Sequence, residues 1–323
     1  MSKQPTVIST FAGCGGSSLG YKWAGYHELL AIDFNDNAVE TFKLNFDTPI
    51  WNRDIKDCTG QEILDFCGIQ KGELDLLDGS PPCQGFSIAG KRNLSDERND
   101  LYREFVRLIT ELQPKVFVME NVSGMIKGGY KGKFNEILKT LKDTGYSVKV
   151  KLLNAMWYEV PQSRERLIFI GVRNDLGIEP LYPEPLSRVI TVKDAFAGLP
   201  VEQTRELPRG ALKEIVPKIG QGETASKYHV KGNYFGTHRL HYQKPSPTII
   251  KTAGATMNLL LHPEVDAGIS INELKRLSTF PDDFKFIGDY KKQWARIGNA
   301  VMPRFMYHIA KTIKEKILDK VNG

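Results

Sequence analysis

The chain has 323 residues, enough for one large domain or for a large domain and a small one. With 41% hydrophobic and 25% charged residues, and no apolar run near the ~18 residues that a bilayer span needs, we expect no membrane segment. The four cysteines are too few for a disulfide framework and stand in no zinc-binding pattern, so we expect reduced thiols, no metal and a cytoplasmic location. The net charge of +6 only leans towards an anionic partner.

Short β-branched runs alternate with helical stretches through the first 173 residues. This alternation is typical of an α/β fold with a Rossmann-like, doubly wound and mostly parallel sheet. In chain order we predict strands at 7–11 and 29–33, helices at 35–45 and 61–67, a strand at 74–78, a helix at 101–112, a strand at 116–119, a helix at 134–143 and a strand at 166–172. Ligands bind outside the carboxyl ends of the strands in such sheets, so the loops after these runs should carry the chemistry.

From about residue 174 to 243, prolines, glycines and polar residues interrupt every apolar run, and no helix of normal length is predicted. Helical periodicity returns at 271–277 and 303–317, which suggests that the C-terminus packs back onto the first domain. We therefore expect a first domain of residues 1–173 plus about 285–323. A small, irregular second domain of about 174–284 should complete the chain.

A glycine-rich turn, Phe11 to Gly16, follows the first predicted strand. Such a turn lets a ligand approach the backbone closely, although a plain strand-to-helix turn reads the same way. Asp33 ends the second strand 17 residues after Gly16, near the spacing of about 20 at which an acidic side chain binds a ribose. Phe34 offers an aromatic face, and Asp54 follows the expected third strand. Together these residues predict a nucleoside cofactor without saying which one.

Two further strand ends carry reactive groups. Cys83 stands behind two rigid prolines after the fourth strand, which holds it in a fixed position. Glu120 ends the apolar run of the fifth strand, where a charge needs a partner or a raised pKa. Adjacent parallel strands would bring the two together. A structural cysteine and a satisfied structural carboxylate are the alternative interpretations.

With these residues in place, the chain resembles the DNA cytosine-5 methyltransferase family of the bacterial and phage type over nearly its whole length. The motifs that carry the resemblance stand in the family's order: the glycine turn 11–16, Pro-Pro-Cys-Gln at 81–84, Glu-Asn-Val at 120–122, Gln-Ser-Arg-Glu-Arg at 162–166, Arg-Leu-Ser-Thr-Phe-Pro at 276–281 and Ile-Gly-Asn-Ala-Val at 297–301.

The resemblance implies a cofactor, S-adenosyl-L-methionine, and a class I methyltransferase fold. It implies that the first domain is catalytic and that the second is a target-recognition domain, with recognition mainly in 174–243. It implies that the cofactor pocket is lined by Phe11, Gly13, Gly15, Gly16, Asp33, Phe34, Asp54, Ile55, Leu101, Asn299 and Val301.

The resemblance also implies the chemistry. C5 of cytosine is too weak a nucleophile to take a methyl group unaided, so the thiolate of Cys83 adds to C6 of a flipped-out cytosine. Glu120 holds the N3 and amino edge of the base. Arg164 is our candidate for the positive charge that favours the thiolate, and Arg166 orients Glu120 or the base carbonyl.

Contacts with DNA are predicted in two stretches. Residues 85–99 form the polar stretch that the family uses as a mobile lid, and residues 225–243 are basic, aromatic and free of acids. Any one of these charges also fits an ordinary solvated surface. The predicted DNA-binding residues are Ser87, Lys91, Arg92, Arg98, Lys227, Lys231 and Arg239. The pattern does not single out which side chains read base edges.

The chain departs from the family at one point. The family often has an arginine a few residues before the glutamate that is Glu273 here, but this chain reads Asp-Ala-Gly-Ile-Ser-Ile-Asn over 266–272. A local packing or backbone contact is therefore in doubt, while the catalytic set is intact.

The resemblance implies a sequence-specific methyltransferase of double-stranded DNA, nucleoid-associated and monomeric. A cognate restriction endonuclease acting on the same site is the expected second partner. A tRNA cytosine-5 methyltransferase is an alternative, disfavoured because the Cys-Phe-Thr tripeptide of such relatives is absent. A catalytically silent DNA-binding relative is another alternative, against which the intact Cys83 and Glu120 argue.

Overall fold

The computed structural model describes residues 4–82, 101–126, 131–200, 205–228, 236–252, 254 and 258–321. The chain divides into two compact units. Unit 1 comprises residues 1–154, 165–184 and 305–323, and unit 2 comprises residues 155–164 and 185–304. The boundaries differ from those predicted, because 155–164 and 285–304 belong to unit 2 and 174–184 to unit 1.

Among the described residues, unit 1 contains a seven-stranded sheet of strand order β3-β2-β1-β4-β5-β7-β6. Strands β3 to β5 in this order pair in parallel, whereas β7 runs antiparallel to both of its neighbours. The strands are β1 (Thr6–Thr10), β2 (His27–Asp33), β3 (Ile50–Asn52), β4 (Leu76–Gly79), β5 (Val116–Val122), β6 (Tyr146–Asn154) and β7 (Glu165–Arg173). The predicted doubly wound, mostly parallel sheet is confirmed.

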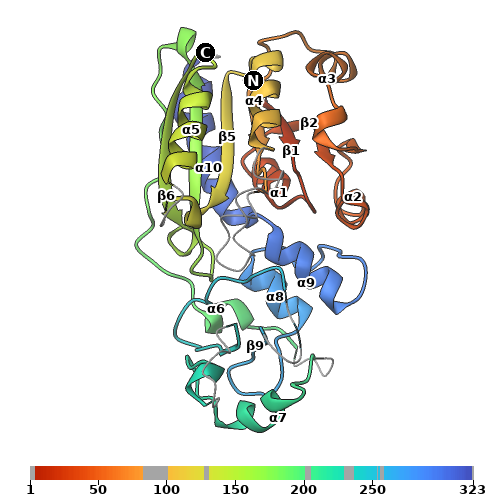
Figure 1. The fold of residues 1–323 in the computed structure, drawn as a ribbon, viewed down its shortest axis with the longest axis vertical. Helices are drawn as coiled ribbons and strands as arrows, with labels where there is room; N and C mark the ends of the chain where they lie inside the picture. The colour runs from red at the N-terminus through yellow and green to blue at the C-terminus, as the bar shows by residue number, and fades with distance from the viewer. Residues whose placement is uncertain are drawn as a thin grey trace. The chain divides into compact units, whose positions relative to one another are not determined.

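Helices cover both faces of this sheet. One core cluster joins the inward side chains of α3, α4 and α5 to strand residues such as Ile8, Leu77 and Phe117. On the other face, the Tyr26 hydroxyl after α1 donates to the Ala310 carbonyl of α10 (3.0 Å), and Figure 1 shows α10 behind the sheet. The helices are α1 (Gly16–Trp23), α2 (Asp36–Lys43), α3 (Gly60–Cys67), α4 (Tyr102–Leu112), α5 (Lys131–Lys142), α10 (Pro303–Ile313) and α11 (Asp319–Val321).

Local sequence explains most of these elements. The β5 run 116–119 is fully buried, as expected of a parallel strand covered on both faces. Helix α3 begins at a capping box in which Thr59 and Glu62 satisfy each other's backbone N–H groups. Strand β6 was not predicted. Its alternation of valine and lysine at 148–151 is typical of an edge strand with one solvent-exposed face.

Unit 2 contains little regular structure, as predicted for its central part. The described helices between 174 and 243, α6 (Val192–Phe196) and α7 (Ala211–Ile215), have five residues each. The predicted helix at 271–277 is α8 (Ile271–Leu277), while α9 (Tyr290–Asn299) was not predicted. Two short strands, β8 (His238–Arg239) and β9 (Leu260–Leu261), pair in parallel. Within the described ranges, no helix combines the length and apolar composition that crossing a membrane requires.

A buried polar network underlies the first turn of unit 1. Glu28 accepts hydrogen bonds from the hydroxyls of Ser9 (2.5 Å) and Ser18 (2.7 Å), and Asp78 accepts one from the Tyr21 hydroxyl (3.0 Å). Burial raises the pKa of Glu28 to about 7 and the pKa of Asp78 to about 8. Both carboxyls therefore favour the protonated form inside the fold.

This network predicts a pH-dependent stability. A carboxyl whose pKa is raised by folding stabilises the fold fully below its unfolded pKa, and this contribution is lost as the pH rises through the folded pKa. Between pH 6.5 and 8, chemical denaturation should show the free energy of unfolding falling, by up to about 1.4 kcal/mol per pH unit for each carboxyl still protonated. In Asp78→Asn most of this slope should disappear; an equal slope in wild type and variant would contradict the assignment.

Candidate active site

The predicted reactive groups lie along one edge of the unit 1 sheet. Parallel strands β3, β2, β1, β4 and β5 are neighbours in that order, so their carboxyl ends meet at the same edge. Along this edge follow Asp54, then Asp33, then Phe11, then Ser80, and then Glu120 inside the end of β5. The strand order also reverses here, between β1 and β4, which is where doubly wound sheets bind their ligands.

The glycine turn has the backbone conformation that its sequence predicts. Gly15 caps α1 with φ 93°, and a Cβ atom there would lie 2.3 Å from the ring of Phe46, so both the backbone and the space demand glycine. Phe11 also has a positive φ of 53°. At Gly13 nothing lies within 4 Å of the position that a Cβ would take, so the turn is open on that side.

Asp33 and Phe34 form the centre of the predicted cofactor site. The two carboxylate oxygens of Asp33 accept the backbone N–H groups of Gly13 and Asn35, each at 2.8 Å, which fixes the carboxylate against the glycine turn. The side chain of Phe34 is 64% exposed although it is large and apolar. An unburied aromatic face beside an anchored carboxylate suits a stacked base with its ribose.

The remaining predicted cofactor residues divide between the two units. In unit 1, Asp54 caps a short helical turn by accepting the Lys56 N–H, Ile55 is buried, and Leu101 packs against the main core. In unit 2, Asn299 is the exposed last residue of α9 and Val301 is buried. The unit 1 residues thus lie at the sheet edge, while Asn299 and Val301 belong to unit 2.

Glu120 has an ion-pair partner. The Arg166 Nε lies 2.6 Å from the Glu120 Oε1, and the two side chains are only 13% and 12% exposed. Antiparallel pairing of β5 with β7 places Arg166 opposite Val122, two residues beyond Glu120, which brings the guanidinium to the carboxylate. The pair fixes one carboxylate oxygen.

Asn121, which the sequence did not single out, connects this strand to the proline loop. Its side chain is 2% exposed and donates to the Pro81 carbonyl (3.4 Å), two residues before Cys83. Cys83 itself lies outside the described residues, as do Ser87, Lys91, Arg92, Arg98 and Lys231. Among the described residues, no group of three histidine, cysteine or acidic side chains could hold a metal ion.

Arg164 lies in unit 2. Its side chain is buried, and its Nη1 donates to the Ile249 carbonyl (2.6 Å). The neighbouring Gln162 receives the Ile249 N–H (3.0 Å) and Ser163 donates its N–H to the Ser246 carbonyl (2.7 Å). Arg164 therefore helps to hold residues 246–249, a structural part that the sequence did not reveal.

Arg239 corrects a prediction. We expected it to contact DNA, but it is 6% exposed and all five guanidinium N–H groups are used inside unit 2. It donates to the carbonyls of Val216, Ile219, His262 and Val265 and to the carboxylate of Asp266. Lys227 is exposed but pairs with Glu223, which lies just outside the stretch that appeared free of acids.

Glu273, near which the chain departs from the family pattern, has a partner that is distant in the sequence. Arg205 donates to both oxygens of Glu273, each at 2.6 Å, and both side chains are almost fully buried. Glu273 also caps α8 by accepting the Ser270 N–H (2.8 Å). Glu273 therefore has a buried arginine partner that lies 68 residues earlier in the chain.

Comparison with known proteins agrees with this geometry. The family model "C-5 cytosine-specific DNA methylase" matches residues 5–315. The chain belongs to the C-5 cytosine-specific DNA methylase family. It is 31% identical to the type II methyltransferase M.Eco47II of Escherichia coli, over 98% of this chain and 80% of that protein, and 34% identical to M.NgoFVII of Neisseria gonorrhoeae, over 97% and 87%.

Solved structures of similar proteins share the fold. A prophage-encoded Escherichia coli protein described as a DNA modification methyltransferase superposes with a TM-score of 0.78 at 27% identity, covering 98% of this chain and 100% of its own. Spodoptera frugiperda DNMT2 gives a TM-score of 0.71 at 19% identity, covering 96% of this chain and 99% of its own, which shows the fold alone. The chain is thus a DNA (cytosine-5-)-methyltransferase in which Arg166 and Glu120 pair at the sheet edge.

The buried pair predicts a separation of stability from activity. Arg166→Met and Glu120→Leu should each lower the free energy of unfolding by about 3 kcal/mol, because each leaves a charge buried without its partner. The double variant should recover most of this loss and still transfer no methyl group. Chemical denaturation and a methylation assay on all three variants measure this, and single variants as stable as the double would contradict it.

The role of Arg239 predicts a loss of stability rather than of DNA contacts. Arg239→Met leaves four carbonyls and a carboxylate without their donor, so we expect a loss of about 3–5 kcal/mol in the free energy of unfolding. The matched control Lys227→Met removes an exposed pair that solvent screens, so its free energy of unfolding should stay close to that of the wild type. A stable Arg239→Met protein with weakened, less salt-dependent DNA binding would restore the original prediction.

Proposed function

We propose that the protein is a sequence-specific methyltransferase that transfers a methyl group from S-adenosylmethionine to C5 of a flipped-out cytosine in double-stranded DNA. The observation that carries the proposal is the Glu120 carboxylate of β5, which Arg166 of β7 holds in place. The next residue, Asn121, contacts Pro81 in the loop that leads to Cys83. Family membership and the names of the type II relatives support DNA as substrate and a restriction-modification setting.

S-adenosylmethionine, when bound, supplies an electrophilic methyl group. In our proposal Asp33, anchored by the N–H groups of Gly13 and Asn35, accepts hydrogen bonds from the ribose hydroxyls, since each oxygen of a carboxylate can accept more than one hydrogen bond. Phe34 stacks on the base, and Asp54 accepts from the exocyclic amine. Phe11, Gly13, Gly15, Gly16, Ile55, Leu101, Asn299 and Val301 complete the proposed cofactor-binding set.

The proposed reaction uses Cys83 as nucleophile. Its thiolate forms a bond to C6 while a proton is delivered to N3 through the Glu120 carboxyl, so that C5 becomes enamine-like and takes the methyl group. Loss of the C5 proton to a base or water, return of the N3 proton and breaking of the C6–sulfur bond release 5-methylcytosine and regenerate the thiolate. We keep Arg164 as the candidate positive charge and Arg166 as the residue that orients Glu120.

The proposed substrate must expose its target base. Unstacking one cytosine costs a few kcal/mol, roughly the value of one or two good protein contacts. We propose that Ser87, Lys91, Arg92 and Arg98 contact the DNA from the lid stretch, and Lys231 from the recognition stretch. We further propose that the enzyme acts as a monomer on nucleoid DNA, with a restriction endonuclease cognate to the same site.

The covalent step can be trapped. A duplex of mixed sequence carrying 5-fluorocytosine should form a stable adduct with the wild-type protein and S-adenosylmethionine, because fluorine cannot leave C5 as a proton does. Cys83→Ala should form none, and denaturing electrophoresis separates the two outcomes. An adduct with tRNA but not with duplex DNA would favour the RNA alternative, and binding with neither adduct nor methyl transfer would favour a silent DNA-binding protein.

A further inference from the structure

Arg209 differs from three other arginines of unit 2 that reach solvent. Each of those three has an ion-pair partner: Arg188 pairs with Asp194, Arg276 with Asp282 and Arg304 with Glu159. Arg209 is exposed and has no such partner among the described residues. An exposed guanidinium without an acidic partner among the described residues is available for a ligand.

The segment that carries Arg209 is held firmly at its start. Arg205 is fixed by both oxygens of the buried Glu273 and by the Gly268 carbonyl (3.2 Å). The Glu206 carbonyl accepts the Gly268 N–H (2.8 Å). A side chain on a rigid support loses less conformational freedom on binding than one on a free loop, which favours specific contacts.

The segment is held equally firmly at its end. Gly210 follows Arg209 with φ 57° and ψ −139°, a conformation open in practice only to glycine, although there is room for a Cβ atom. Helix α7 then begins, and its Leu212 and Ile215 are buried in the small core of unit 2. This leaves Lys213 exposed on the other side of the helix, also without an ion-pair partner among the described residues.

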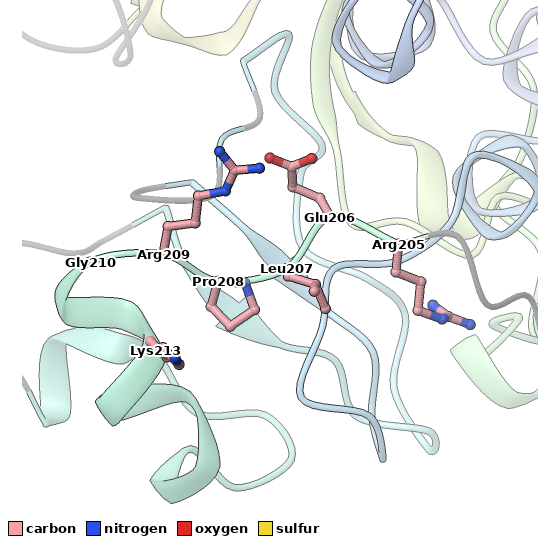
Figure 2. A pocket seen from close by; sticks show the side chains of 7 residues that line it. All are labelled: Arg205, Glu206, Leu207, Pro208, Arg209, Gly210 and Lys213. Carbon is pink, nitrogen blue, oxygen red and sulfur yellow. The ribbon is translucent and has the colours of Figure 1, made fainter.

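Residues 205–210 and Lys213 line a recess of about 530 Å³. Figure 2 shows the side chains of Arg209 and Glu206 extending to the same side of the segment, while Arg205 points away from them. Leu207, which lies between Glu206 and Arg209 in the sequence, is 64% exposed. A surface that binds only phosphates would not be expected to carry an acid and an exposed leucine. The hydrogen-bond donor Arg209, the acceptor Glu206 and the apolar Leu207 together match the kinds of groups found on the edges of bases.

We infer that residues 206–210 form a base-reading segment in which Arg209 donates to the O6 and N7 atoms of a guanine in the recognition sequence. Lys213 contacts a neighbouring phosphate. Arginine to guanine is the most frequent specific contact in the major groove, and an ammonium group binds phosphate without regard to sequence. The inference rests on the proposed function, and it gives the recognition of DNA to residues other than the buried Arg239.

The test is a comparison of methylated sequences. Wild type, Arg209→Ala, Lys213→Gln and the control Arg188→Ala, which removes another exposed arginine of unit 2, are each incubated with S-adenosylmethionine and a random-sequence duplex library. Sequencing after bisulfite conversion gives the methylated motif. kcat/KM and the salt dependence of binding are then measured on the wild-type motif, with melting temperature and S-adenosylmethionine affinity as controls for folding.

We expect Arg209→Ala to lose its preference for guanine at one motif position and to lower kcat/KM on the wild-type motif about ten- to a hundredfold. Lys213→Gln should keep the motif, weaken binding evenly and reduce the salt slope by about one. Arg188→Ala should match wild type.

An unchanged motif in a folded Arg209→Ala protein overturns the inference, whether binding weakens evenly or not at all, and leaves the proposed function standing. No methyl transfer by wild type to any duplex would overturn the proposed function itself, and this inference with it.

Discussion

Parallel pairing of β3, β2, β1, β4 and β5 is the constraint on which the proposed site depends. It brings the carboxyl ends of these strands to one edge, so that Asp33, Phe34 and the glycine turn lie on one side of the switch point and the proline loop and Glu120 on the other. Methyl transfer needs a donor and an acceptor side by side, and strand order alone supplies that arrangement. Close to the same edge, the buried Asp78 of β4 accepts a hydrogen bond from the Tyr21 hydroxyl of α1, which connects this strand to the helix.

Unit 2 is held together differently. It has few regular elements among the described residues, and buried guanidinium groups connect its irregular segments. Arg239 joins four carbonyls and Asp266, and Arg205 joins Glu273 at the start of α8. Burying a cation is costly unless every donor is satisfied, so these arginines fix a particular arrangement of the segments around them. That arrangement is what leaves Arg209 exposed on a rigid support.

Sequence reasoning succeeded where the signal is local. Buried runs and the glycine turn predicted the sheet and the turn that follows its first strand, because periodicity and turn chemistry depend on near neighbours. It failed where partners are distant: Arg239 reads as a DNA-binding cation because Asp266 and the carbonyls are brought to it only by folding, and the pairing of Arg205 with Glu273 spans 68 residues. Strand β6 was missed because half of its side chains are polar, as at any edge.

The claim that the sheet edge holds a nucleoside is tested most directly by calorimetric titration with S-adenosylmethionine of wild type, Phe34→Ala and Phe66→Ala. Both phenylalanines are exposed side chains of unit 1, but only Phe34 follows β2 at the reactive edge. Since stacking on one aromatic ring contributes roughly 1–3 kcal/mol, Phe34→Ala should raise the Kd by about tenfold or more, and Phe66→Ala should leave it unchanged. Equal affinity of Phe34→Ala and wild type would contradict the account.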